Sequence, residues 1–258
     1  MQIERKPRDQ TPPRDEGRLL MRYGWNALIA EGAGTFLFFF VGIGSAAMVD
    51  WSAVVGQELP GLLVVALAHG LVLAVLVSSL GAVSGAHFNP AVTFGVWVAG
   101  QIGGRKAIAY VVAQLVGGVL AAFVLRTVFP AEISPRLGTP ALGPGIESSG
   151  GLAIEAVLTV VLLLAVFGTA IDPRGPKVGG LAIGLAVGAD ILMGGPLTGA
   201  AMNPARWFAP ALITGTWDNA PVWVIGPLVG AAIAARAYRL FFLPESRPGR
   251  SPATPAGE

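Results

Sequence analysis

The chain has 258 residues, and its composition argues against a water-soluble domain. Only 12% of the residues are charged, 53% are hydrophobic and the mean hydropathy is +0.67, whereas soluble domains carry about 25% charged residues. Without cysteine, the chain can form no disulfide, thiol nucleophile or cysteine-bound metal site. The net charge of +2 comes from residues at the chain ends and on short loops, which indicates membrane orientation rather than nucleic-acid binding.

Six apolar segments are long enough to cross a membrane as helices. A hydrocarbon core of ~30 Å needs about 20 predominantly apolar residues in a helix. The sequence therefore predicts an all-α membrane protein with six transmembrane helices. These segments are 27–49, 62–80, 107–128, 152–171, 178–193 and 221–243.

Two further apolar segments, 89–100 and 203–214, are too short to span the membrane. At ~1.5 Å of rise per residue, each would reach only about halfway across the ~30 Å core. Each begins with Asn-Pro, which suits a helix start because Asn is a good N-cap and Pro is favoured at the first helical position. We expect two re-entrant half-helices, whose ends must be satisfied by protein or by a water-filled cavity.

The basic residues predict how the chain is oriented. Of the 17 lysines and arginines, all but Arg126, Arg136 and Arg206 lie on the side of the membrane that holds both termini. Because lysine and arginine concentrate on the cytoplasmic side, we expect both termini to be cytoplasmic, in a multi-pass protein of the plasma membrane. Residues 1–24 and 244–258 are expected to be cytoplasmic tails.

The two halves of the hydrophobic segment resemble each other. Residues 84–91 (SGAHFNPA) correspond to residues 198–205 (TGAAMNPA), and Glu31 in the first span corresponds to Glu155 in the fourth. An odd number of spans separates equivalent points, so the second copy is inverted in the membrane. Inverted repeats with broken helices place the functional site near the bilayer midplane, where the half-helices meet.

The duplicated Asn-Pro-Ala tripeptide resembles the signature of the aquaporins, the major intrinsic protein family. Each copy begins a half-helix and follows Ser/Thr-Gly-Ala, and the resemblance covers an aquaporin-like channel domain at about 25–243, with repeats at about 25–129 and 150–243. It implies a passive water channel in the lipid bilayer, a homotetramer with a pore in each subunit, and no enzymatic activity, cofactor or metal. The signature residues are Asn89, Pro90, Ala91, Asn203, Pro204 and Ala205, followed by Arg206.

These residues have a direct physical role at the midplane. Two facing helix N-termini each present about half a positive charge, which repels cations and protons moving along a water chain. The side-chain amides of Asn89 and Asn203 can both donate to one water oxygen, so that water cannot accept from its neighbours. We expect the Asn carbonyls to cap their own helices. The resemblance also implies that backbone carbonyls line the water path, namely those of Gly85, Ala86, His87, Gly199, Ala200 and Ala201.

Counting from the motif, as the resemblance implies, gives a selectivity filter of His69, Ile191, Ala200 and Arg206. Strict water channels usually have Phe and His at the first two positions, and glycerol channels usually have Trp at the first and Phe near the third. The set is instead similar to the filters of plant tonoplast intrinsic proteins, which pass water and sometimes ammonia, urea or hydrogen peroxide. The short aliphatic and methyl side chains predict a somewhat wider opening.

Five further polar or aromatic residues lie within or beside the apolar segments. Glu31 and Glu155 are interpreted as buried acceptors for the backbone of the adjacent loops rather than as proton relays. His87 is expected to brace its loop, and Asp190 to pair with another span. Trp207 is unusual, because water channels favour Ser and glycerol channels carry Asp at this place.

Alternatives to a water channel remain open. A broader pore for ammonia, urea, hydrogen peroxide or glycerol fits the same fold. A secondary transporter also uses inverted repeats and broken helices, but it needs an ion-binding group near the breaks, and neither half-helix contains Asp or Glu. An intramembrane enzyme is disfavoured, because the chain has only two histidines and lacks HExxH, GxSxG and phosphate-binding glycine motifs.

Overall fold

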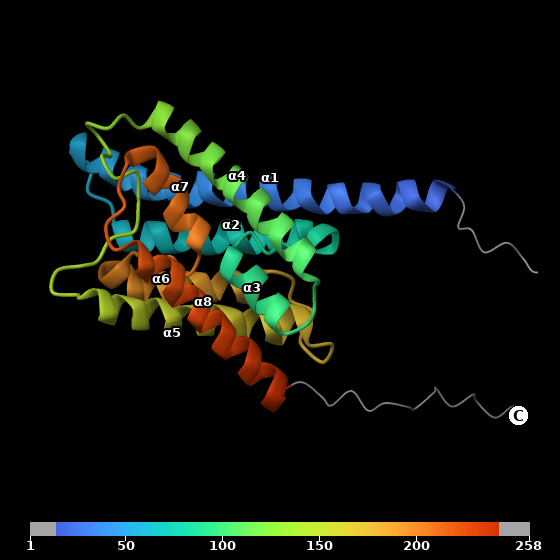
Figure 1. Ribbon diagram of the computed structural model, residues 1–258. Coiled ribbons are helices and arrows are strands. Elements are labelled where there is room, and N and C mark those ends of the chain that lie inside the picture. The colour runs from blue at the N-terminus through green and yellow to red at the C-terminus, as the bar shows by residue number, and fades with distance from the viewer. Residues whose placement is uncertain (1–13, 243–258) are drawn as a thin grey trace, which may run out of the picture.

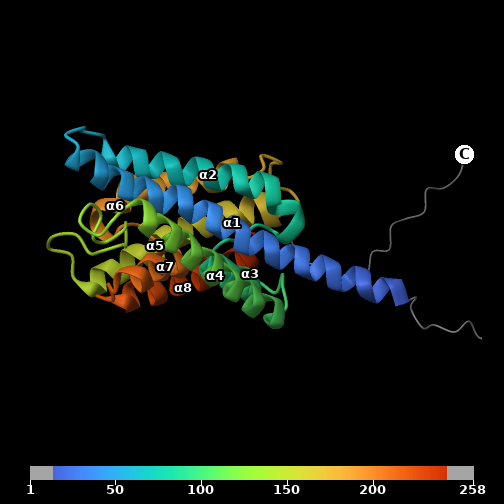
Figure 2. The same ribbon diagram turned by 90° about the horizontal axis from the view of Figure 1, so that it is seen from above.

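The computed structural model describes residues 14–242, with side chains from Gly24 onward, as a bundle of helices (Figures 1 and 2). Within this part of the chain there is no strand. The first 13 residues and the expected C-terminal tail at 244–258 lie outside the described residues. In chain order the elements are α1 (Arg14–Val54), α2 (Gly61–Ser84), α3 (Pro90–Val98), α4 (Gly104–Val128), α5 (Ser148–Val166), η1 (Phe167–Ile171), α6 (Leu181–Thr198), α7 (Pro204–Thr214), α8 (Ala220–Ala237) and η2 (Tyr238–Phe242).

Six of the described helices are long and apolar enough to cross a membrane: α1, α2, α4, α5 continued by η1, α6, and α8 continued by η2. The short helices α3 and α7 lie within the bundle (Figure 1). The spanning helices present large apolar side chains to the surroundings, among them Ile108 on α4 and Leu185 on α6. This confirms the predicted fold class of six transmembrane helices with two half-helices.

The helix contacts follow the inverted repeat. In the first repeat α1 packs against α2 and α4, and in the second α5 packs against α6 and α8. The half-helices cross over: α3 contacts α8, and α7 contacts α4. Each half-helix is therefore held by the last span of the opposite repeat, which brings the starts of α3 and α7 together.

Glycines allow the closest helix contacts, at equivalent places in the two repeats. A Cβ added to Gly117 on α4 would lie 2.0 Å from the carbonyl oxygen of Gly32 on α1. A Cβ added to Gly230 on α8 would lie 2.1 Å from the carbonyl oxygen of Ala156 on α5. Such backbone approaches are open only to glycine, as is common where helices pack in lipid.

Several helices extend beyond the apolar segments that the sequence indicates, and α1 and α6 do so furthest. The helix α1 begins at Arg14, so part of the segment expected to be an N-terminal tail is helical. The helix α6 covers Leu181–Thr198 rather than 178–193, passes through Pro196 and ends where Gly199 adopts a left-handed backbone with φ 79°. Hydropathy indicates the part of a helix that lies in hydrocarbon. Polar or glycine-rich helix ends have low hydropathy, so a search for apolar segments does not detect them.

Candidate functional site

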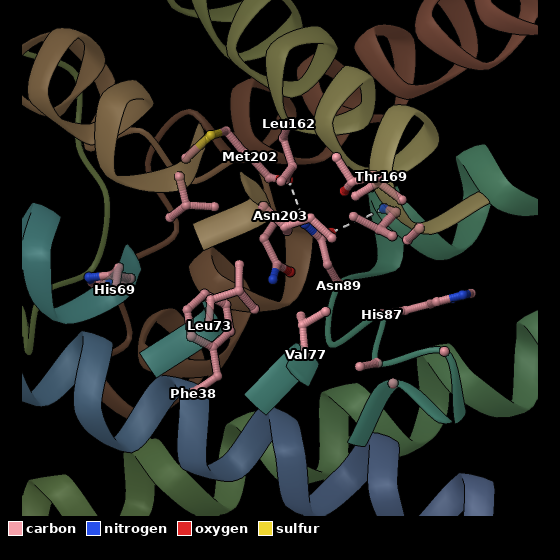
Figure 3. Close-up of a pocket in the computed structure, with 18 of the residues that line it drawn as sticks. Phe38, His69, Leu73, Val77, His87, Asn89, Leu162, Thr169, Met202 and Asn203 are labelled. Atoms are coloured by element: carbon pink, nitrogen blue, oxygen red, sulfur yellow. Dashed lines mark hydrogen bonds between the residues drawn. The ribbon is translucent and has the colours of Figure 1, made fainter. Parts of the chain in front are cut away.

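A cavity of about 620 Å³ lies between the two repeats (Figure 3). It is lined at one end by Lys177 from the connection between α5 and α6, and at the other by His69 of α2 and Arg206 of α7. Asn89 and Asn203 line it between these ends. Figure 3 shows the two asparagines close together in the cavity. The sequence motif and the cavity therefore coincide.

Each asparagine caps its own half-helix through its side-chain carbonyl. Asn89 Oδ1 accepts from the backbone N–H of Ala91 at 2.8 Å, and Asn203 Oδ1 accepts from that of Ala205 at 3.0 Å. Both residues are extended, with φ −157° and −151°, which is the usual conformation of an N-cap. The N-termini of α3 and α7 are thereby fixed at the cavity wall.

The amide nitrogens of the same side chains link the two repeats. Asn89 Nδ2 donates to the carbonyl oxygen of Met202 at 2.9 Å, and Asn203 Nδ2 donates to that of Phe88 at 3.0 Å. A side-chain amide has two N–H donors, so each asparagine keeps one for a molecule in the cavity. Capping, cross-linking and donation to the pore are compatible in one residue.

Two buried carboxylates hold the loops that precede the half-helices. Glu31 accepts from the backbone N–H groups of His87 and Phe88, both at 2.9 Å. Glu155 accepts from those of Ala201 and Met202 at 2.9 and 2.7 Å. Both glutamates are fully buried. They hold equivalent loops in the two repeats, which supports their interpretation as acceptors for the loop backbone.

The loops need this support because their backbone is strained. Ala86, Phe88, Ala200 and Met202 all have positive φ, between 45° and 50°. Residues other than glycine rarely adopt this conformation, and it persists only where the surroundings enforce it. In this conformation, the backbone of both loops runs along the cavity wall.

Arg206 and His69 form a direct hydrogen bond at the end of the cavity. Arg206 Nε donates to His69 Nε2 at 3.1 Å, and Arg206 Nη1 donates to the carbonyl oxygen of Gly138 at 2.8 Å. His69 Nδ1 lies 2.9 Å from the carbonyl oxygen of Val65. Since that carbonyl can only accept and the guanidinium can only donate, His69 is neutral and carries its proton on Nδ1.

The other two expected filter residues lie at the same cavity. Ile191 and Ala200 are buried, with 3% and 4% of their surface exposed, and both line it. Gly42 of α1 makes room for the imidazole, because a Cβ there would lie 2.6 Å from His69 Cδ2. The structure thus brings His69, Ile191, Ala200 and Arg206 together, although they come from three helices and a loop.

Most of the loop residues that precede the half-helices lie at the cavity wall. Gly85, Ala86, His87 and Ala201 line the cavity, whereas Gly199 is outside this lining and packs against Pro140. His87 Nδ1 lies 3.0 Å from Thr93 Oγ1, a contact that braces its loop. Asp190 Oδ2 is buried and has no hydrogen-bond partner among the described residues, so the expected pairing with another span is not seen.

Much of the cavity wall is apolar, and the sequence alone does not identify the residues that form it. Side chains of this kind include Phe38, Leu73, Val77 and Leu162. They stand in runs of similar residues, and nothing in their spacing distinguishes a pore-facing position from a lipid-facing one. Among the described residues, no group of three or more His, Cys, Asp or Glu side chains could hold a metal ion.

An ion pair orders the connection at the end of the cavity away from Arg206. Asp172 Oδ2 lies 2.6 Å from Arg174 Nη2. The hydrogen bonds from the side chain and backbone of Arg174 hold the pKa of Asp172 below its usual range. These contacts hold the first residues of the connection that contributes Lys177 to the cavity wall.

Six spanning helices in an inverted repeat, with two capped half-helices meeting at a cavity, define a polytopic membrane channel. Residues 20–238 match the model of the major intrinsic proteins, and the chain belongs to this family. Aquaporin TIP4-4 from Zea mays is 46% identical over 221 residues, which cover 84% of this chain and 86% of that protein. The lens fiber major intrinsic protein of Lithobates pipiens is 40% identical over 245 residues, 91% of each chain.

The fold has a counterpart among solved structures. The X-ray structure of the aquaglyceroporin from Plasmodium falciparum matches with a TM-score of 0.72 and 25% sequence identity, over 84% of this chain and 96% of that chain. The family indicated by the duplicated tripeptide is confirmed. Membership identifies the chain as a multi-pass membrane channel and not an enzyme.

Proposed function

We propose that the cavity between the half-helices is the path of a passive water channel. The observation that carries this conclusion is the pair of asparagines that cap α3 and α7. They lie together in the cavity wall, and each retains one N–H donor. Water passing this point can accept from both. The similarity to aquaporins of Zea mays and Arabidopsis thaliana supports the same conclusion.

The same geometry excludes cations and protons. The N-termini of α3 and α7 each direct about half a positive charge at the passing molecule. Arg206 adds a full charge, and its hydrogen-bond partners, His69 and the carbonyl of Gly138, are neutral. A water that accepts from both asparagines cannot accept from its neighbours, so a proton cannot hop through it.

Selectivity among neutral molecules is assigned to His69, Ile191, Ala200 and Arg206. With an aliphatic residue and a methyl group on two sides, the opening admits ammonia, urea or hydrogen peroxide beside water. The likeness to an aquaglyceroporin makes glycerol the second candidate. The carbonyls of Gly85, Ala86, His87, Ala200 and Ala201 complete the proposed water path, and Gly199, which lies outside the cavity lining, is left out of it.

The apolar outer surface and the distribution of basic residues support a homotetramer in the membrane with cytoplasmic termini. Residues 25–243 form the channel domain, with repeats at about 25–129 and 150–243. The basic residues favour cytoplasmic termini. We place the channel in the plasma membrane as part of the same proposal. A homotetramer would cover part of the apolar outer surface, and lipid would cover the rest.

Stopped-flow light scattering on proteoliposomes tests which molecules pass. A sucrose step measures water efflux, and steps of urea, glycerol and ammonium measure solute entry. We expect fast water efflux, measurable ammonia or urea entry and little glycerol entry. Glycerol entry as fast as water efflux would reassign the chain to the glycerol channels, and flux that required an ion gradient would indicate a transporter.

A further inference from the structure

Trp207 follows Arg206 in α7, and its surroundings differ from those of its counterpart in the first repeat. Thr93 occupies the same place after Asn89 as Trp207 does after Asn203. Thr93 Oγ1 accepts a hydrogen bond from Gln114 Nε2 of α4 at 2.9 Å and lies 3.0 Å from His87 Nδ1. The first half-helix is therefore tied to its neighbours by a polar network.

An aromatic stack replaces that network in the second repeat. The Trp207 ring lies parallel to that of Trp223 of α8, with centroids 5.9 Å apart and an interplanar angle of 11°. Trp217, in the connection before α8, meets Trp207 edge-on at 5.6 Å and 75°. Trp207 and Trp223 are almost fully buried, with 3% and 1% exposed. Parallel and edge-on aromatic pairs restrict each other's position.

Trp223 links this stack to the loop that carries Ala200. Its Nε1 donates to the carbonyl oxygen of Thr198 at 2.9 Å, and Thr198 Oγ1 accepts from the backbone N–H of Ala200 at 3.1 Å. The stack thus joins two parts of the filter: Arg206 in the first turn of α7, and Ala200, whose φ of 45° must be enforced by its surroundings.

The indole nitrogen of Trp207 shows what the side chain contributes. Trp207 Nε1 is buried and has no acceptor among the described residues. An unsatisfied buried donor costs free energy, so hydrogen bonding is not the contribution of this residue. Its contribution is the packing of a large flat ring between α7, α8 and the connection that precedes α8.

We propose that Trp207 is a positioning residue that sets the width of the filter, an inference that rests on the proposed function. The stack holds Arg206 and the Ala200 loop at a fixed separation. Without the ring, the first turn of α7 gains room to shift, and the opening admits larger neutral molecules. Trp207 contacts no permeating molecule itself, because it is absent from the described cavity lining.

The test compares urea and water permeability in proteoliposomes that hold equal amounts of protein. For Trp207→Ser we expect the urea-to-water ratio to rise severalfold while water permeability persists. Trp207→Phe keeps an aromatic ring and should retain the native ratio. Trp97→Ser is the matched control, because Trp97 lies on α3 outside the stack with 46% of its surface exposed; its ratio should be native.

A native ratio in Trp207→Ser would contradict the proposal and reduce Trp207 to a space-filling residue. If that variant fails to enter membranes, Trp217→Ala decides, because it removes the edge contacts with Trp207 and Phe208 of α7 and leaves the parallel pair of Trp207 and Trp223 in place. An increased ratio supports the proposal and a native one overturns it. Absence of water conduction by the unmodified chain would instead contradict the proposed function, so the two failures are distinguishable.

Discussion

His69 fixes how the guanidinium of Arg206 is presented to the cavity. The carbonyl of Val65 holds the proton of His69 on Nδ1, which leaves Nε2 free to accept from Arg206 Nε. A hydrogen bond that involves a charged donor contributes roughly 1.5–3 kcal/mol. The orientation of the arginine is therefore set by α2 as well as by its own helix.

We predict that His69→Phe lowers urea and ammonia entry while water efflux persists. The larger ring fills the opening, and Arg206 Nε loses its acceptor. Stopped-flow measurement of both fluxes checks this. Leu71→Phe, an equally large change on the exposed face of α2, should leave both fluxes native. Unchanged solute entry in His69→Phe would place His69 outside the constriction.

The absence of cysteine provides a second test at single residues. Mercurials inhibit by binding thiolates, and this chain has none, so HgCl₂ should not reduce its water permeability. Ala200→Cys places a thiol at the filter and should confer inhibition that a reducing thiol reverses. Ile108→Cys, on the outer face of α4, is the control and should stay insensitive. Insensitivity of Ala200→Cys would remove Ala200 from the water path.

The loop before α7 depends on one carboxylate. In Glu155→Gln an amide N–H group would face a backbone N–H donor, either that of Ala201 or that of Met202. Each unsatisfied group costs about 1–3 kcal/mol, so we predict a lower thermal unfolding midpoint in detergent. Glu147→Gln, at an exposed position before α5, should keep the native midpoint. Equal midpoints would show that the loop is held without this charge.

The contact of α1 with α4 depends on Gly117. A methyl group there would lie 2.0 Å from the carbonyl oxygen of Gly32, so the helices must separate. Overpacking of this kind costs about 1–3 kcal/mol, and we predict a lower unfolding midpoint for Gly117→Ala. Gly81→Ala is the control, because nothing lies within 4 Å of its added Cβ. A native midpoint in Gly117→Ala would mean that the two helices can separate at no cost.

At the scale of elements, the sequence predicts six spans and two half-helices because hydropathy, segment length and Asn-Pro caps are local properties. It does not predict the ends of α1 and α6, since helices continue beyond the hydrocarbon core and Pro196 does not end the second one. The filter positions follow from family resemblance. The bond from Arg206 to His69 and the tryptophan stack join residues far apart in the chain, and their geometry depends on side-chain rotamers that no local pattern specifies.

In the whole molecule, the two repeats contribute equivalent half-helices that meet end to end at the cavity. Because the second repeat is inverted, the N-termini of α3 and α7 meet, and each cap donates across the interface to the opposite loop. The exchange of half-helices between repeats means that neither repeat can form the pore alone. Water conduction without proton conduction is then a property of the complete fold.

Osmotic water permeability and proton flux, measured in the same proteoliposomes, most directly test whether the pore conducts water without conducting protons. A sucrose step reports water efflux, and a pH-sensitive dye inside the vesicles reports the decay of an imposed pH gradient. We predict water efflux far above that of empty vesicles, with weak temperature dependence, and a pH gradient that decays as slowly as in empty vesicles. Water efflux at the level of empty vesicles, or a pH gradient that collapses together with fast water efflux, would contradict this prediction.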